Sequence, residues 1–228
     1  LVHVYTDGSV HLNHGGTEMG QGLHTKVAQV VADVFQVDID RVKITATTTA
    51  KVPNTSATAA SSGSDLNGMA AQNAAEQIRE RLIDFAVKTH AVPREQLLFQ
   101  PNAVLIGNRR ISFDDFIREA YMGRVHLSAA GFYKTPDIHW DRAAGKGRPF
   151  YYYAYGAACS EVSVDSLTGE YHVDRTDILH DVGRSLNPAV DKGQVEGAFI
   201  QGMGWLTTEE LWWDDKGRLR THAPSTYK

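Results

Sequence analysis

The stretch His14-Gly15-Gly16-Thr17-Glu18-Met19-Gly20-Gln21-Gly22-Leu23-His24 is a glycine-punctuated loop that leads directly into an apolar helix. Glycine has no Cβ, so it tolerates positive φ angles and lets a ligand approach the backbone closely. Beyond the loop, apolar residues recur with the spacing of one helical face, at Leu23, Val27, Val30, Val31, Val34 and Phe35. The pattern predicts a helix over residues 22 to 36, with the loop at its N-terminus.

The junction between this loop and the helix has chemistry suited to a ligand. The first four amides of a helix have no partners within the helix and lie at the positive end of its dipole. Gln21 adds an amide side chain that both donates and accepts hydrogen bonds. These groups suit a phosphate, a heterocycle edge or an oxo ligand. The alternative is a plain turn, because the pattern is neither G-x-G-x-x-G nor a Walker loop.

Composition narrows the class of protein. The 228 residues are 42% hydrophobic and 22% charged, as in ordinary globular domains. A formal net charge of -4 without a long Lys/Arg run argues against nucleic-acid binding. No apolar run approaches the roughly 20 residues that span a bilayer, so we expect no membrane partner and a cytoplasmic location. The single cysteine, Cys159, excludes a disulfide or a cysteine-ligated cluster within the chain, and its strand-like surroundings predict a buried thiol.

A second loop, like the first, comes directly before a predicted helix. Residues 52–64 are small, hydroxyl-rich and uncharged, and they follow a β-branched strand predicted over residues 40–47. They precede the clearest helical pattern of the chain, from Asp65 to about Val87, for which Ser64 or Asp65 is the expected N-cap. The residues alone leave a flexible linker and a ligand loop equally open. If it is a ligand loop, two helix starts converge on one ligand.

The other segments predict an α+β fold of mixed sheets and hairpins with packed helices. Asp7-Gly8 is a turn signal for a hairpin over residues 2–13. In that hairpin, His11 and His14 are three residues apart and point to opposite faces of a strand, which argues against a shared metal ion. Further strands are predicted at 97–99, 103–106, 110–113 and 125–133, a short helix at 114–121, a surface loop at 134–149, and a long hairpin formed by 157–164 and 171–181.

A last helix is predicted from about Ala189 to Leu211, behind the capping pair Asn187-Pro188. A glycine costs about 1 kcal/mol relative to alanine inside a helix. Four glycines lie here nevertheless, Gly193, Gly197, Gly202 and Gly204. We therefore expect a close approach to this backbone, and Gln194 and Gln201 share a face with Gly197 in an amide-lined groove. Plain helix packing explains the glycines nearly as well, but the glutamines less well.

Five motifs occur along the chain in a fixed order. They are His14-Gly15-Gly16-Thr17-Glu18-Met19-Gly20-Gln21-Gly22, Val52-Pro53-Asn54-Thr55-Ser56-Ala57-Thr58-Ala59-Ala60-Ser61, Asp65-Leu66-Asn67-Gly68, Gly131-Phe132-Tyr133-Lys134-Thr135-Pro136, and Leu186-Asn187-Pro188 with Gly193-Gln194-Val195-Glu196-Gly197-Ala198-Phe199. In this order they resemble the molybdenum-binding domain of the xanthine oxidase family of molybdenum hydroxylases, of bacterial type. The resemblance covers essentially the whole chain. It implies that residues 1–228 are the second half of the molybdopterin-binding domain, a fragment without its upstream half and C-terminal segment.

The resemblance implies a cofactor and roles for individual residues. In the family, pterin sulfurs rather than cysteines ligate molybdenum, which agrees with the lone cysteine here. The positions matched to pterin or phosphate binding are Gly20, Gln21, Gly22, Thr58, Ser61 and Gln194. Ala59 and Ala60 match the border of the substrate pocket, with the Ala60 backbone near molybdenum. The implied reaction hydroxylates hypoxanthine and xanthine to urate, and iron–sulfur clusters and FAD on other domains or subunits of an oligomeric enzyme pass electrons to NAD.

The chain also departs from the family pattern. The family's catalytic base is a glutamate in a Gly-Glu-Pro-Pro segment, whereas Gly169-Glu170 here continues as Tyr171-His172. One serine of the family's second loop falls on Gly63. We therefore expect no catalytic residue in this chain and no activity from it alone.

Three alternatives remain at this point. In the first, the complete protein is an aldehyde oxidase-type hydroxylase. In the second, it is a non-catalytic cofactor-binding or assembly module. The third, an acyl hydrolase with an oxyanion loop at His14-Gly15-Gly16, is disfavoured because the chain has no G-x-S-x-G nucleophile elbow.

Overall fold

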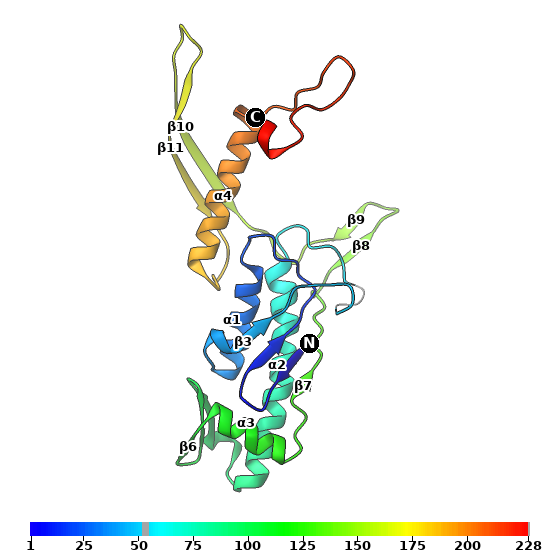
Figure 1. Ribbon diagram of the computed structural model, residues 1–228, viewed down its shortest axis with the longest axis vertical. Helices are drawn as coiled ribbons and strands as arrows, with labels where there is room; N and C mark the ends of the chain where they lie inside the picture. The colour runs from blue at the N-terminus through cyan, green and yellow to red at the C-terminus, as the bar shows by residue number, and fades with distance from the viewer. Residues whose placement is uncertain (52–54, 228) are drawn as a thin grey trace. The chain divides into compact units, whose positions relative to one another are not determined.

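The computed structural model describes residues 1–51 and 55–227, which form two compact units (Figure 1). Unit 1 is Leu1–Tyr151 and unit 2 is Tyr152–Lys228. Val52, Pro53 and Asn54, which begin the second motif, lie outside the described residues.

A four-stranded sheet in the order β3-β2-β1-β7 carries the core of unit 1. Its strands are β1 (Val2–Val4), β2 (Val10–Leu12), β3 (Val42–Ile44) and β7 (Ser128–Ala129). The first two form the predicted antiparallel hairpin, β7 is antiparallel to β1, and β3 is parallel to β2. Parallel neighbours need a long crossover connection, and α1 (Leu23–Phe35) lies in the connection from β2 to β3.

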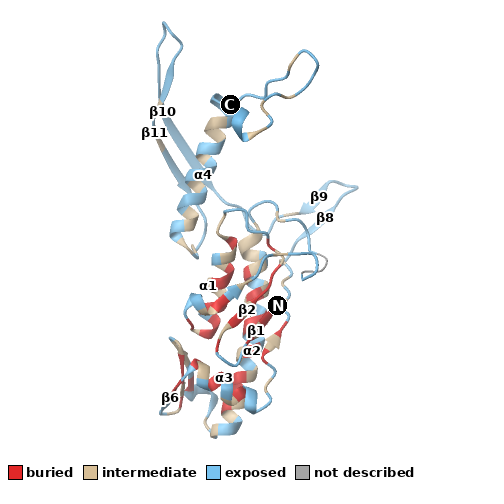
Figure 2. Ribbon diagram, viewed as in Figure 1, coloured by how far each residue is buried: buried red, intermediate tan, exposed pale blue. Residues whose placement is uncertain are grey.

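Helix α2 (Gly63–His90) packs along α1 in unit 1 (Figure 1). Strand alternation sends one face of the hairpin into the core, with Val2, Val4, Val10 and Leu12 all buried. Helix α1 buries Val27, Val31 and Phe35, and α2 buries Ala74, Ile78 and Leu82. Figure 2 shows these buried residues where the helices face each other and the sheet. The core thereby fixes the starts of both helices.

A second, three-stranded sheet completes unit 1. Its antiparallel strands are β4 (Leu97–Gln100), β5 (Ala103–Ile106) and β6 (Arg109–Ser112), in that order. Helix α3 (Phe113–Met122) follows, capped by Ser112, whose Oγ accepts a hydrogen bond from the Asp115 N–H at 3.1 Å. Phe113 and Phe116 are fully buried, so α3 joins the same core. The short elements of unit 1 are η1 (Ile39–Arg41), η2 (Arg94–Gln96), β8 (His139–Asp141) and β9 (Lys146–Arg148).

Unit 2 consists of a hairpin, a helix and a C-terminal segment. Strands β10 (Gly156–Val164) and β11 (Tyr171–His180) pair with a bulge between Glu161 and Val162. Helix α4 (Pro188–Thr207) follows the cap Asn187, and η3 (Pro224–Thr226) lies near the chain end. Every residue of β10 is exposed and none of α4 is buried (Figure 2). Within its described residues, unit 2 therefore has no hydrophobic core of its own.

The structure confirms the predicted α+β class with mixed sheets and hairpins. The N-terminal hairpin, α1, the three strands of the second sheet, α3 and the β10–β11 hairpin lie where the sequence predicts them.

Several boundaries were predicted wrongly. Helix α2 begins at Gly63 behind Ser62, not behind Ser64 or Asp65, and the Ser62 side chain makes no capping bond. Helix α4 ends at Thr207 rather than Leu211. The predicted strand 40–47 is a 3-10 turn followed by a three-residue strand, and the predicted surface loop 134–149 contains the β8–β9 hairpin.

Two further predictions fail for non-local reasons. Only Ser128–Ala129 of the predicted strand 125–133 pairs with the sheet, because the chain then crosses the backbone of α2 at Gly131. Cys159 is exposed rather than buried, because neither face of β10 is covered within unit 2.

The crossing at Gly131 generates a stability prediction. A Cβ there would lie 1.9 Å from the Ala70 carbonyl oxygen, so Gly131→Ala forces two backbone segments apart. We expect urea denaturation of residues 1–151 to show a loss of at least about 2 kcal/mol. The matched control is Gly68→Ala, whose Cβ would meet only Val30 at an ordinary 3.7 Å. It should be neutral or stabilise by up to about 1 kcal/mol, and equal effects of both changes would contradict the close crossing.

Candidate functional site

The first motif forms the connection between β2 and α1. Gly22 is the N-cap of α1 with φ 73°, and Gly20 has φ 102°, both values that favour glycine. Gly15 has a different role, because a Cβ at this position would lie 2.7 Å from the Thr55 side chain. The glycines thus shape the turn into the helix and admit the second loop.

Three amides around this helix start are already hydrogen-bonded. Glu18 turns its carboxylate onto them, with Oε1 accepting from the N–H groups of Gly20 at 2.9 Å and Gly22 at 3.0 Å, and Oε2 from that of His24 at 2.9 Å. Burial raises the pKa of Glu18, but these three backbone hydrogen bonds outweigh it and lower the pKa below its usual value. At these three amides the chain supplies its own anion, and a ligand at this junction stays a prediction.

Gln21 folds back onto its own loop rather than projecting from it. Its Oε1 accepts a hydrogen bond from the Met19 N–H at 2.6 Å, and its Nε2 donates to the Thr17 carbonyl at 2.9 Å. A primary amide has two N–H donors and two acceptor lone pairs. Gln21 consequently keeps one N–H and one lone pair for a ligand while its orientation is fixed by the loop.

Hydrogen bonds join the first loop to the chain that follows β3. The Thr17 N–H donates to Thr58 Oγ1 at 2.9 Å, and Thr47 Oγ1 donates to the Gly16 carbonyl at 2.9 Å. Because the Thr58 hydroxyl accepts this bond, its own proton remains to be donated. Residues 55–62 are therefore held against the first loop, which favours a ligand loop over a linker.

The second loop presents small residues to the surface. Ala59, Ala60 and Ser61 are exposed, and Thr58 is half-buried. Ala60 has φ 58°, the left-handed region that non-glycine residues seldom occupy. Strained backbone of this kind clusters at functional sites, and here it falls on a residue already matched to the metal environment.

The starts of α1 and α2 meet. A Cβ built at Gly63, the first residue of α2, would lie 3.3 Å from the Leu23 side chain, the first residue of α1. A Cβ at Gly16 would lie 3.0 Å from the side-chain nitrogen Nδ2 of Asn67, which lies within the first turns of α2. The two helix starts thus lie close together in unit 1, as predicted, and their convergence on one ligand stays a prediction.

His14 is buried beside these loops, with 9% of its surface exposed. Its Nδ1 accepts a hydrogen bond from the Gly16 N–H at 3.1 Å, and its ring meets His24 edge-on at a centroid distance of 5.1 Å. Burial, and then the neighbouring His24, lower the pKa of His14 to about 4 against the opposing influence of Asn67 and Glu18. His14 is therefore neutral at pH 7, as an acceptor at Nδ1 requires.

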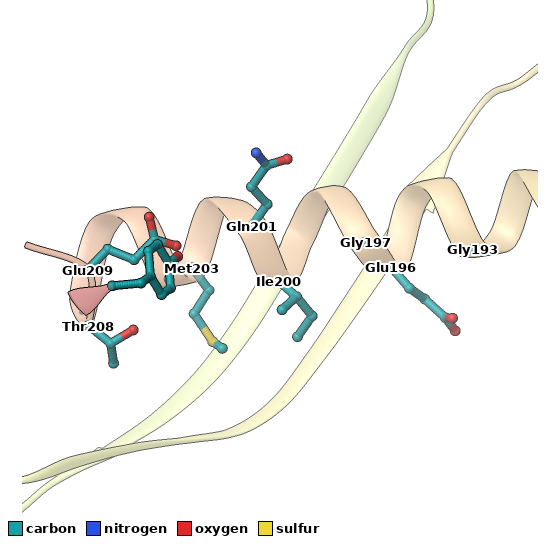
Figure 3. Close-up of a pocket in the computed structure, with 10 residues that line it drawn as sticks. Gly193, Glu196, Gly197, Ile200, Gln201, Met203, Thr208 and Glu209 are labelled. Atoms are coloured by element: carbon teal, nitrogen blue, oxygen red, sulfur yellow. The ribbon is translucent and has the colours of Figure 1, made fainter. Parts of the chain in front are cut away.

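The predicted groove on α4 lies in unit 2. It is an open groove of about 960 Å³ lined by the glycine backbone at Gly193, Gly197 and Gly204, with Ile200, Met203 and Gln201 among its other residues (Figure 3). Gln194 is exposed on the same helix but does not line the groove, so only one of the two predicted glutamines does. A Cβ at Gly193, Gly197 or Gly202 would meet no described atom within 4 Å. The described residues therefore do not explain these three glycines.

The structure thus brings together Gly20, Gln21 and Gly22 with Thr58 and its neighbours Ala59, Ala60 and Ser61, all in unit 1. Gln194 belongs to unit 2. The sequence did not identify three residues that build the site, Thr17, Glu18 and Thr47. A glutamate shortly before a helix start is a usable signal, because carboxylates are favoured there.

The donor set suits an organic group. In residues 1–51 and 55–227, no three or more His, Cys, Asp and Glu side chains are placed to hold a metal ion. The loops offer backbone groups, hydroxyls and one amide instead.

None of the helices in the described part of the chain has the length and apolar character needed to cross a bilayer.

Comparison with known proteins assigns the family. Two neighbouring helix starts, with their loops joined by a hydrogen bond, are an arrangement suited to a cofactor-binding domain. The molybdopterin cofactor-binding domain matches residues 1–228, and the chain belongs to this family.

Among its relatives, the xanthine dehydrogenase/oxidase of Mus musculus is 50% identical over 228 residues, and the xanthine dehydrogenase of Oryza sativa is 47% identical over 235 residues. All of this chain is covered in both cases, but the chain spans only 16% of the length of each relative. The crystal structure of quinoline 2-oxidoreductase from Pseudomonas putida 86 shares the fold, with a TM-score of 0.76 and 23% identity over 99% of this chain and 28% of that one.

The low pKa of His14 predicts a pH dependence of stability. The unfolded chain binds the His14 proton near pH 6.5, whereas the folded chain binds it near pH 4. Stability contributed by neutral His14 is therefore full above about pH 6.5 and falls as the pH drops toward 4. His14→Asn keeps an acceptor near the Nδ1 position. Its free energy of unfolding should fall between about pH 7 and pH 5 by about 1–2 kcal/mol less than that of the unaltered chain.

Urea denaturation of residues 1–151 at both pH values measures this difference. His139→Asn, on the exposed β8 strand, is the control and should leave the pH dependence as it is in the unaltered chain. An unchanged pH dependence in His14→Asn would show that His14 is not held neutral by burial.

Proposed function

We propose that the chain provides the molybdopterin-binding half-site of a xanthine-hydroxylating oxidoreductase of purine catabolism. The observation that carries this proposal is the Thr17–Thr58 hydrogen bond, which joins the two loops that hold seven of the eight matched site residues. The 50% identity to a xanthine dehydrogenase/oxidase supports this substrate class. The complete protein would then convert hypoxanthine and xanthine to urate.

The described loops fit a pterin cofactor in their chemistry. Gln21 retains one N–H and one lone pair, and the Thr58 hydroxyl retains its proton. These groups, with Ser61, would hold the pterin, and Gly20 and Gly22, whose N–H groups bind Glu18, would let it approach the loop backbone closely. When bound, the cofactor supplies the molybdenum-dependent two-electron oxidation that places oxygen on a purine carbon.

The chain's own residues would bind and orient the cofactor and the purine, and none would carry a proton in the reaction. Ala59 and Ala60 have the smallest side chains compatible with a wall beside a planar purine, and both are exposed on the loop. The left-handed backbone of Ala60 would set the direction of its peptide groups toward the metal side of the pocket. Gln194 belongs to unit 2, and its role in cofactor binding rests on the resemblance alone.

The proposal includes partners outside this chain. The remaining part of the molybdenum domain would supply the catalytic glutamate, and iron–sulfur and FAD domains or subunits would pass electrons to NAD. The complete enzyme would be an oligomer working in the cytoplasm.

A substitution at Gln21 tests the assignment in the complete protein. Gln21→Ala should lower molybdenum content and xanthine-dependent NAD reduction while folding survives, because it removes hydrogen bonds and no core volume. A hydrogen bond of about 1 kcal/mol corresponds to about a fivefold loss in cofactor binding. Metal analysis and absorbance of the NADH formed measure the two quantities.

Gln72→Ala is the matched control, because the Gln72 side chain on α2 hydrogen-bonds Glu76 in its own helix. It should retain full metal content. Full metal content in Gln21→Ala would remove Gln21 from the site, and a correctly matured protein without molybdenum would overturn the proposed function. Oxidation of aldehydes but not purines would replace it with an aldehyde oxidase-type activity.

A further inference from the structure

We infer that Glu18 is a positioning residue for the cofactor: its carboxylate clamps the loop from Thr17 to Gly22 into the shape that presents Gln21. The inference rests on the proposed function. It concerns a residue whose carboxylate binds backbone amides and acts through the backbone that carries Gln21.

The geometry of the clamp spans the whole turn. One carboxylate binds the N–H groups of Gly20, Gly22 and His24, at 2.9, 3.0 and 2.9 Å. Gln21 lies between two of these three anchored residues. Its conformation is thereby enclosed on both sides by bonds to one side chain.

Gln21 depends on this turn for its own contacts. Its amide bonds the Met19 N–H and the Thr17 carbonyl, so both of its partners lie within the clamped segment. Thr17 also donates to Thr58 of the second loop. Loosening the Glu18 clamp would thus release Gln21 and weaken the junction between the two loops together.

The charge of Glu18 explains why it acts as a clamp and not as a ligand for the cofactor. Both carboxylate oxygens are engaged by backbone donors, and these bonds lower the pKa of Glu18 despite burial, so the group is ionised at neutral pH. A negative charge at the positive end of α1 favours the helix and repels a second anion. A phosphate would have to displace the carboxylate, so this helix start presents the cofactor with an uncharged edge at Gln21.

The test compares three variants of the complete protein, Glu18→Ala, Glu18→Gln and the control Glu76→Ala. Glu76 carries the same charge on the surface of α2, where it accepts a hydrogen bond from Gln72. Hydrogen exchange of amides 19–24 reports the clamp, exchange of β5 amides 103–106 reports the fold, and bound molybdenum reports the cofactor.

In Glu18→Ala, we expect exchange at residues 20, 22 and 24 to accelerate by about tenfold or more, and molybdenum content to fall several-fold. Exchange in β5 should stay unchanged. Glu18→Gln keeps one acceptor oxygen for Gly20 and Gly22, so both effects should be partly rescued. Glu76→Ala should match the unaltered protein in every readout.

The outcomes separate this inference from the proposed function. Unchanged exchange in Glu18→Ala would overturn the clamp, and faster exchange with full molybdenum content would overturn its positioning role. If Glu18→Ala fails to fold, as β5 exchange would reveal, Glu18→Gln decides the question by the same criteria. An unaltered protein that holds no molybdenum overturns the proposed function itself, and with it the inference.

Discussion

A hydrogen bond from the Thr17 backbone N–H to the Thr58 hydroxyl, at 2.9 Å, joins two loops through residues that are 41 positions apart in sequence. Each loop lies directly before a helix, and the two helix starts lie so close that a Cβ added to Gly63 would be 3.3 Å from the Leu23 side chain. The helices are fixed by the buried face of the sheet. The relative position of the loops therefore follows from the core of unit 1, which is what a pre-formed binding wall requires.

Within the first loop, backbone groups without regular secondary structure must find partners elsewhere. Glu18 and Gln21 satisfy them from within the loop, and Thr47 and Thr58 do so from the following segment. The loop is consequently rigid by hydrogen bonding rather than by apolar packing. Rigidity of this kind leaves the outer surface of the loop available to a ligand.

Unit 2 is built differently. The side chains of Leu179, Trp205 and Leu206 are each more than 70% exposed, and the glycine-lined face of α4 is open. Apolar surface of this extent is normally covered by another part of a protein or by a partner. The chain spans 16% of the length of its relatives, so much of the structure that surrounds this domain in them lies outside it.

Local sequence patterns predicted the secondary structure well, but they predicted side-chain hydrogen bonds and burial poorly. Helical periodicity located α1, and the Asp7-Gly8 signal located the first hairpin, because both depend on neighbouring residues alone. Glu18 was missed because a carboxylate that turns back onto three amides leaves no periodic pattern. Burial of Cys159 was predicted wrongly because the sequence of a strand does not say whether another layer covers it.

The most direct test of the account is a crystal structure of the complete protein with its cofactor, in which anomalous scattering locates molybdenum. We expect that, within this chain, molybdenum lies nearest to the Ala59–Ser61 backbone, with the Gln21 amide hydrogen-bonded to the pterin and Glu18 still bound to its three amides. A metal nearest to other residues of the chain, or a pterin out of reach of Gln21, would contradict the account.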